Sequence, residues 1–283
     1  RSTAGHHRNV MRRDLLAVVF RPYIFLMKST SMKAFGRAGR KTVGGFLMGI
    51  ILLAGSGAAF AASPVSERIR FEWPKTNFTK HSVSMDEIRS GGPPKDGIPS
   101  IDNPKFTPAS KVKGLKGTEP VIALQINGDA RAYPLGILMR HEIVNDRVGG
   151  VPVAVTYCPL CNAVIVFDAR VDGKATEFGT TGKLRNSDLV MYDRNTESWW
   201  QQFLGEAIVG DLTGKKLKML PSRIESIDRF KKRFPKGKVL VPAFAFMGAF
   251  GANPYAGYDT SPRPFLYNGS MPKGIEPLAR VVA

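Results

Sequence analysis

Cysteine and histidine are scarce in this chain of 283 residues, which contains two cysteines and four histidines. Two cysteines exclude a small domain held together by several disulfides. The sequence also has no internal repeat and no block of five successive lysines or arginines. Because its basic residues form no stripe interleaved with aromatics, we do not expect nucleic-acid binding.

What is present is an ordinary globular composition, with 43% hydrophobic, 10% aromatic and 23% charged residues. It excludes a wholly disordered chain, a collagen-like repeat and a polytopic membrane protein. The formal net charge is +18, and half of it falls within residues 1–61. The remainder of the chain is also basic, which favours contact with anionic surfaces or small anions.

The segment that precedes residue 62 has the pattern of an export signal. Residues 33–42 are basic, residues 43–60 are apolar or small throughout, and Ala59-Phe60-Ala61 is a small-x-small cleavage signal. We therefore expect residues 32–61 to be a signal peptide and residues 1–31 to be disordered upstream read-through. A processed chain would be periplasmic or otherwise extracytoplasmic.

The alternative is an uncleaved anchor, because the apolar stretch approaches the roughly 20 residues needed to span a bilayer. The protein would then be held at the inner membrane by residues 43–62, and this segment would be its one contact with the membrane.

Residues 62–106 are expected to form a polar lead-in with one short helix, and residues 107–283 a single globular domain. The helix is predicted over 84–90, because Ser84 and Glu87 have the spacing of a capping box. The glycines and prolines that follow exclude regular structure up to about residue 99.

From residue 119 onward the sequence predicts strands joined by hairpins. Asn-Gly at 127–128 separates the runs 121–126 and 129–133, and this dipeptide is the strongest short hairpin signal. A second hairpin is predicted across Gly149-Gly150, and a third between 163–168 and 175–178 around Asp172-Gly173. Further elements are one or two helical turns within 134–140 and strands at 189–193, 206–209, 215–220 and 239–241.

One amphipathic helix is predicted over 223–234, with Ser222 and Glu225 as a capping box and Pro235 as its stop. Residues 242–283 are rich in glycine, proline and aromatics, so we expect a long coil-rich tail. With hairpins throughout and one good helix, the predicted fold is α+β, a predominantly antiparallel β sheet or barrel.

The sharpest local feature is Cys158-Pro159-Leu160-Cys161, and three interpretations compete. In a thioredoxin-like site the CxxC opens a helix, but a β-type run follows here. In a metal knuckle the turn points both sulfurs at one ion, and the next residue often has a positive φ, which suits Asn162. In an oxidising compartment the pair can also form a plain structural disulfide.

One CxxC supplies half of a tetrahedral site, so other ligands must be histidine or carboxylate. His141 is predicted at the start of the strand that pairs with the strand leading to Cys158. We therefore expect Cys158, Cys161 and His141 to be the candidate ligands of one transition metal ion. Thiolate and imidazole suit zinc, copper or iron.

Polar side chains between two predicted strands, in the loop 178–188, suggest a pocket beside this site. The loop presents lysine and arginine to a small anion, with an aspartate as ligand or base. The adjacent tryptophans 199 and 200 are expected to point to opposite faces of a strand, one into the core and one to a pocket rim. The candidate pocket residues are Glu142, Lys183, Arg185, Asn186, Asp188, Trp199 and Trp200.

Several long stretches resemble the domain-of-unknown-function family 3179. They are SGGPPKDGIPSIDNPKF (90–106), INGDARAYPLGILMRHEIVNDRVGGVPVAVTYCPLCNAVIVFD (126–168), FGTTGKLRNSDLVMYDRNTESWWQQFLGEAIVG (178–210) and YDTSPRPFLY (258–267). The resemblance implies an exported or membrane-tethered prokaryotic protein, and it implies that His141, both cysteines and the 182–188 loop belong to the family signature. It implies no activity.

These observations favour an exported protein with a metal- or thiol-dependent site built on the CxxC and histidine beside a polar pocket. The alternative is a non-catalytic binding or scaffold protein of the cell envelope with a structural CxxC disulfide. The partner would be an unidentified small ligand or an envelope protein, and the sequence leaves open whether the protein is an enzyme.

Overall fold

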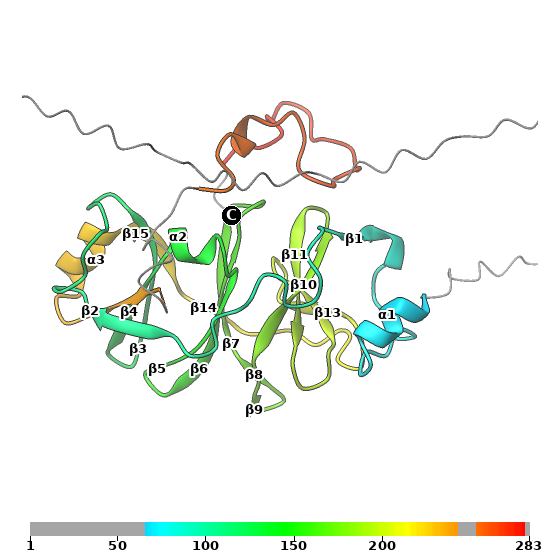
Figure 1. Ribbon diagram of the computed structural model, residues 1–283, viewed down its shortest axis with the longest axis horizontal. Coiled ribbons are helices and arrows are strands. Elements are labelled where there is room, and N and C mark those ends of the chain that lie inside the picture. The colour runs from blue at the N-terminus through cyan, green and yellow to red at the C-terminus, as the bar shows by residue number, and fades with distance from the viewer. Residues whose placement is uncertain (1–65, 243–252, 281–283) are drawn as a thin grey trace, which may run out of the picture. The chain divides into compact units, whose positions relative to one another are not determined.

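A computed structural model describes residues 66–242 and 253–280, in which three antiparallel-rich β-sheets are the main elements (Figure 1). The predictions for residues 1–31 and 32–61 lie outside these ranges. Sheet A has the strand order β1-β10-β11-β12-β13, and all its pairs are antiparallel. Its strands are β1 (Ile88–Ser90), β10 (Phe178–Arg185), β11 (Asp188–Asp193), β12 (Trp199–Gln201) and β13 (Glu206–Val209).

Sheet B has the order β14-β7-β6-β5, and sheet C has the order β15-β3-β4-β16-β2. Within sheet C, β16 pairs with β4 in parallel, and the other pairs are antiparallel. The strands of sheet B are β5 (Ile143–Val148), β6 (Val151–Cys158), β7 (Ala163–Asp168) and β14 (Met219–Leu220). Those of sheet C are β2 (Lys105–Pro108), β3 (Pro120–Ile126), β4 (Asp129–Pro134), β15 (Arg223–Ser226) and β16 (Lys238–Val241).

The remaining elements are short. They are the hairpin β8 (Arg170–Val171) and β9 (Lys174–Ala175), the helices α1 (Glu67–Glu72), α2 (Leu135–Leu138) and α3 (Ile227–Arg233), and the 3-10 turns η1 (Met85–Glu87) and η3 (Tyr258–Thr260). Of the two predicted architectures, a sheet or a barrel, the described residues show open sheets. None of their helices is long and apolar enough to cross a membrane.

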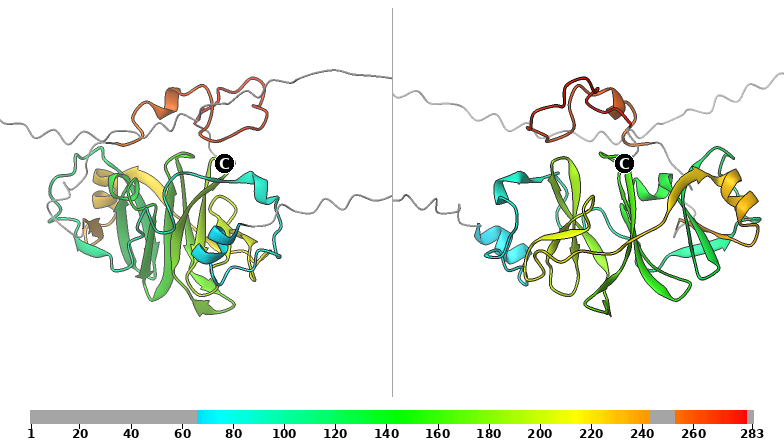
Figure 2. Two further views of the ribbon diagram at one scale, coloured as in Figure 1. Left: turned by 45° about the vertical axis from the view of Figure 1, so that its right-hand side comes forward. Right: turned by 180° about the vertical axis from the view of Figure 1, so that it is seen from behind.

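The three sheets are stacked, and apolar side chains fill the space on both sides of each. One buried cluster joins sheets C and B, and a second joins sheets B and A. The outer face of sheet C is covered by α3, and the outer face of sheet A by the segment that contains Trp73 and Phe78. Seen from behind, in the right-hand view of Figure 2, sheet B lies between the other two. The central strands, such as β6 and β11, are therefore buried on both faces, whereas edge strands such as β1 and β15 are partly exposed.

Two predicted hairpins are confirmed, and their turns have the backbone that the sequence requires. Asn127 and Gly128 have φ values of 49° and 81° between β3 and β4. Gly149 and Gly150 have φ values of 53° and 87° between β5 and β6. Two successive positive φ values match the right-handed twist of a two-residue hairpin.

The third hairpin was predicted between the wrong partners. Strand β7 pairs with β6 and β14, not with 175–178. The Asp172-Gly173 turn instead joins the short strands β8 and β9. The reason is that the alternating apolar residues of β7 fill both clusters that flank sheet B, whereas Phe178 begins a strand of sheet A.

The amphipathic helix is present, but it begins later than predicted. Residues 223–226 form β15 and pair with β3, so the helix starts at Ile227. Ser226, not Ser222, caps it by accepting a hydrogen bond from the backbone of Arg229 at 3.3 Å. Ile224 belongs to the strand and is 48% exposed, which removes it from the apolar face of the helix.

The lead-in contributes to the fold more than its polar composition suggested. Its predicted helix over 84–90 is a single 3-10 turn followed by β1, which pairs with β10 in sheet A. Trp73 and Phe78 are buried against the same sheet. The described part of the tail, residues 253–280, contains η3 and otherwise irregular backbone, as expected.

Candidate functional site

The two cysteines lie at the tip of the β6–β7 hairpin. Cys158 is the last residue of β6 and pairs with Ala163 at the start of β7. The intervening turn ends at Asn162, whose φ is 48°. Asn162 also accepts a hydrogen bond from the hydroxyl of Tyr157 at 3.1 Å, which holds the turn closed. The positive φ that a metal knuckle favours is therefore present.

Both cysteines are free thiols, and their Sγ atoms lie 2.9 Å apart. Cys158 is buried, and Cys161 is half-buried. The backbone carbonyl of Ser187 lies 3.8 Å from the first sulfur and 3.5 Å from the second. The pair thus faces the turn between β10 and β11 in the neighbouring sheet.

The residue that completes this cluster is Asp188, the first residue of β11. Its Oδ1 lies 3.4 Å from Cys161 Sγ, and its Oδ2 accepts a hydrogen bond from the backbone of Phe203 at 3.0 Å. The ligand atoms of Cys158, Cys161 and Asp188 all lie within 4.8 Å of one another. We refer to these three residues as the knuckle cluster.

The surroundings of Asp188 and Cys161 favour the neutral forms of these two side chains. Burial raises the pKa of Asp188 despite the hydrogen bonds it accepts. The pKa of Cys161 is also raised, first by its hydrogen bond to Cys158, then by burial and by the nearby aspartate. Among the described residues no lysine or arginine pairs with any of the three side chains. A bound cation would supply the missing positive charge.

The predicted ligand His141 is not part of this cluster. Its Nδ1 lies 2.8 Å from the carbonyl oxygen of Pro99, which orients the ring. The next residue, Glu142, is 8% exposed, and its φ is 58°. Burial raises the pKa of Glu142 to about 7.

The predicted polar loop is a strand, and its side chains point in different directions. Residues 178–185 form β10, and Asn186 with Ser187 forms a tight turn at φ values of 52° and 68°. Lys183 Nζ lies over the rings of Trp73 and Trp199, at 5.7 Å and 5.4 Å from their centroids. Burial lowers its pKa.

Arg185 is occupied by two neighbours. Its guanidinium pairs with Glu87 at 2.7 Å and donates to Gln201 Oε1 at 2.5 Å. Of the predicted pocket residues, Asp188 lies in the knuckle cluster. Glu142 and Lys183 line one cavity, which is described below.

The two tryptophans point to opposite faces as predicted, but neither reaches a pocket rim. Trp199 is 1% exposed and packs beside Trp73, and Trp200 is 0% exposed in the cluster between sheets A and B. The indole N–H of Trp200 donates to Asp193 at 3.0 Å. The rim prediction is wrong because both faces of β12 are covered.

A cavity of about 300 Å³ lies beside the knuckle turn. Leu160 of the turn, Leu184 and Leu189 of sheet A, and Glu142 form part of its wall. The wall also includes Gly91, Pro93, Ile98, Gly182 and Lys183, and the C-terminal segment completes it. We refer to this space as the Glu142 cavity; its lining from that segment consists of Tyr255, Tyr258 and Phe265.

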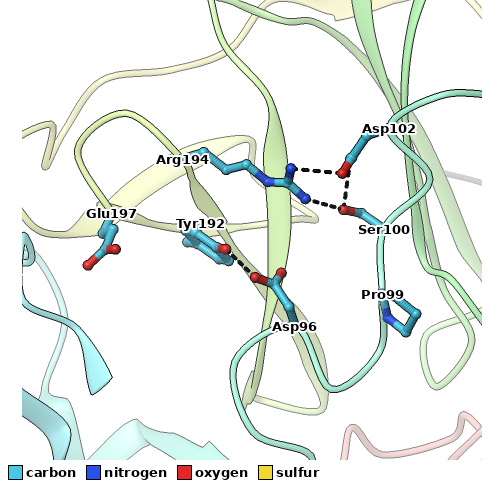
Figure 3. A pocket seen from close by; sticks show the side chains of 7 residues that line it. All are labelled: Asp96, Pro99, Ser100, Asp102, Tyr192, Arg194 and Glu197. Carbon is cyan, nitrogen blue, oxygen red and sulfur yellow. Dashed lines mark hydrogen bonds and ion pairs between the residues drawn. The ribbon is translucent and has the colours of Figure 1, made fainter. Parts of the chain in front are cut away.

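The sequence did not single out a second cavity of about 380 Å³, which is drawn in Figure 3. There Arg194 pairs with Asp102 at 2.8 Å and donates to Ser100 at 2.8 Å, and the Tyr192 hydroxyl donates to Asp96. These contacts join the segment 96–102 to sheet A, although the buried Nε of Arg194 has no hydrogen-bond partner among the described residues. No local signal predicts the network, because its two halves lie far apart in the sequence.

The fold and the site together define a β-rich protein with a two-cysteine knuckle beside a buried carboxylate. The family model described as Protein of unknown function (DUF3179) matches residues 95–283, and the chain belongs to this family. No curated protein and no solved structure matched the chain.

Proposed function

We propose that this is an exported protein that binds a thiophilic metal ion, most consistently Zn²⁺, through the knuckle cluster. The observation that carries the proposal is the placement of two thiols and one carboxylate within 4.8 Å of one another. Three protein ligands leave one coordination position for water or a substrate, which is the pattern of exchangeable and catalytic zinc sites.

The donor set supports zinc over the other two metals expected from the sequence. Zinc accepts both thiolate and carboxylate ligands in tetrahedral sites. Copper(I) and iron–sulfur sites favour sulfur alone, so a buried carboxylate contributes less to them. The sulfurs of a tetrahedral zinc site lie about 3.8 Å apart, so binding requires the two Sγ atoms, now 2.9 Å apart, to separate slightly.

Export is supported by the N-terminal sequence pattern, with its basic stretch, apolar run and cleavage signal before residue 62. In this proposal the site functions in the periplasm or elsewhere outside the cytoplasm. The anchored alternative would leave the same site facing the same compartment.

The metal proposal is tested by elemental analysis of untagged protein purified from the periplasm. The wild type should retain about one zinc per chain, as expected for a single site of this type. Asp188→Asn should lose it, because an amide is a far weaker ligand than a carboxylate. His141→Ala is the matched control and should retain the metal, because its ring bonds to the Pro99 carbonyl and not to the cluster.

Three other outcomes would contradict this assignment. If His141→Ala loses the metal and Asp188→Asn retains it, the third ligand is His141 and not Asp188, as the sequence analysis expected. Equal retention in all variants, Cys158→Ser and Cys161→Ser included, would place the metal elsewhere. A metal-free wild type with its two cysteines bonded would support the envelope scaffold instead.

A second candidate is reversible thiol–disulfide chemistry, which the 2.9 Å separation of the sulfurs favours. In that case the two cysteine thiols are oxidised to one disulfide. Their two electrons and two protons pass to the disulfide of a partner molecule, which is reduced to two thiols. Thiol titration of the native and the reduced protein separates the candidates. A metal site releases two thiols upon chelation, whereas a redox pair responds to the glutathione ratio without a chelator.

A further inference from the structure

The Glu142 cavity contains a carboxylate that has no partner among the described residues. Glu142 is 8% exposed. No hydrogen bond or ion pair to its side chain is recorded within the described residues, and burial alone accounts for its raised pKa. Buried carboxylates are normally paired, so an unpaired one that lines a cavity indicates a missing partner.

The backbone holds Glu142 in this position against its own preference. Its φ of 58° lies in the left-handed region, which is unfavourable for a residue with a Cβ. The conformation is fixed from both sides, because its N–H donates to Leu138 at 2.7 Å and its carbonyl accepts from Tyr157 at 2.8 Å. Strain of this kind, maintained by surrounding structure, is concentrated at functional sites.

Apart from Glu142 and Lys183, the cavity wall is mainly apolar and aromatic. Leu160, Leu184 and Leu189 form one part, and the rings of Tyr255 and Phe265 form another. The amine of Lys183 does not neutralise the carboxylate, since it lies over the rings of Trp73 and Trp199. The wall therefore offers one carboxylate, aromatic rings and aliphatic surface, while the amine of Lys183 is held at the rings of Trp73 and Trp199.

We infer that the Glu142 cavity binds a small organic amine, with the ammonium group on the Glu142 carboxylate and the apolar body against the leucines and aromatic rings. Aromatic rings and a carboxylate both attract an alkylammonium ion. An anionic or a neutral ligand would leave the Glu142 carboxylate without a cationic partner. A volume of about 300 Å³ restricts the ligand to a small molecule.

The probe is phenethylammonium, with phenethyl alcohol as its neutral counterpart and hydrocinnamate as its anionic one. Binding to the full chain is measured by isothermal titration calorimetry. The ammonium probe should bind, the alcohol more weakly and the anion not at all. Glu142→Gln preserves shape and backbone and removes the charge, so it should weaken ammonium binding by about tenfold to a hundredfold and leave alcohol binding unchanged.

Glu67→Gln, an exposed change on α1, is the matched control and should bind like the wild type. Leu184→Phe, which reduces the cavity, should weaken both the ammonium and the alcohol probe. The inference is overturned if the wild type shows no saturable ammonium binding below about 10 mM, a weak limit for a molecule of this size. It is equally overturned if Glu142→Gln binds the ammonium probe as well as the wild type does. Metal content is measured in the same samples, so failure here is distinguishable from failure of the zinc proposal.

Discussion

Replacement of Glu142 by glutamine should change how the stability of the protein depends on pH. Burial raises the pKa of this carboxyl from 4.5 to about 7 in the folded state. Between these two values the folded protein binds more protons than the unfolded chain. The free energy of unfolding therefore falls as pH rises through this window, and the loss is complete above the folded pKa.

The size of the effect follows from the distance between the two pKa values. Each tenfold difference in proton affinity corresponds to about 1.4 kcal/mol, so the ionised carboxylate destabilises the fold by about 3 kcal/mol at pH 8. Glutamine has the shape of the protonated acid and the same backbone strain at a φ of 58°. Glu142→Gln should therefore match the wild type near pH 4.5 and exceed its stability by about 3 kcal/mol at pH 8.

Urea unfolding at several pH values between these limits measures the difference between the two proteins. Because the two proteins differ at one residue, the contributions that they share cancel in this difference. Glu67→Gln, which is exposed on α1, should show no pH-dependent difference from the wild type. A constant difference between Glu142→Gln and the wild type, or one that grows as pH falls, would refute the reasoning.

Three further predictions concern the turn, the metal and the N-terminus. Gly149→Ala should destabilise the fold by clearly more than the roughly 1 kcal/mol expected for Gly150→Ala, as measured by urea unfolding. The reason is that a Cβ at 149 would lie 2.2 Å from the Ile126 carbonyl oxygen, whereas a Cβ at 150 meets nothing within 4 Å. Equal losses of stability in the two variants would contradict this. Zinc affinity, measured by competition with a chromogenic chelator, should fall as pH is lowered because the thiols must lose protons to bind, and a pH-independent affinity would argue against thiolate ligands. A reporter fused after residues 32–62 should be cleaved next to Ala61, and mass spectrometry that finds the intact N-terminus in a membrane fraction would favour the anchor.

The features that the sequence predicted well are those encoded within a few residues. Asn127-Gly128 and Gly149-Gly150 define hairpins because a positive φ is a property of the turn residues themselves. The knuckle geometry, with its positive φ at Asn162, was predictable for the same reason.

The features that it missed depend on how the sheets stack. Asp188 reaches Cys161 because β11 of sheet A lies against the tip of the β6–β7 hairpin of sheet B. His141 is a better zinc ligand by residue type, but type alone does not place it beside the sulfurs. The burial of both Trp199 and Trp200 follows from the covering of both faces of β12, and periodicity along one strand cannot reveal that.

The position of β16 has a consequence for the order in which the fold is completed during synthesis. Strand β2 is an edge strand whose one ladder partner in sheet C is β16, and β16 also pairs with β4. A growing chain can form the β3–β4 hairpin early, but β2 has no neighbour until residues 238–241 have been made. The pairing of β16 with β2 and β4 is thus the late step that completes sheet C. It joins segments far apart in the sequence, and such pairing is intrinsically slow. Until then Lys105–Pro108 remains an unpaired edge, which a chaperone or a second nascent chain can recognise.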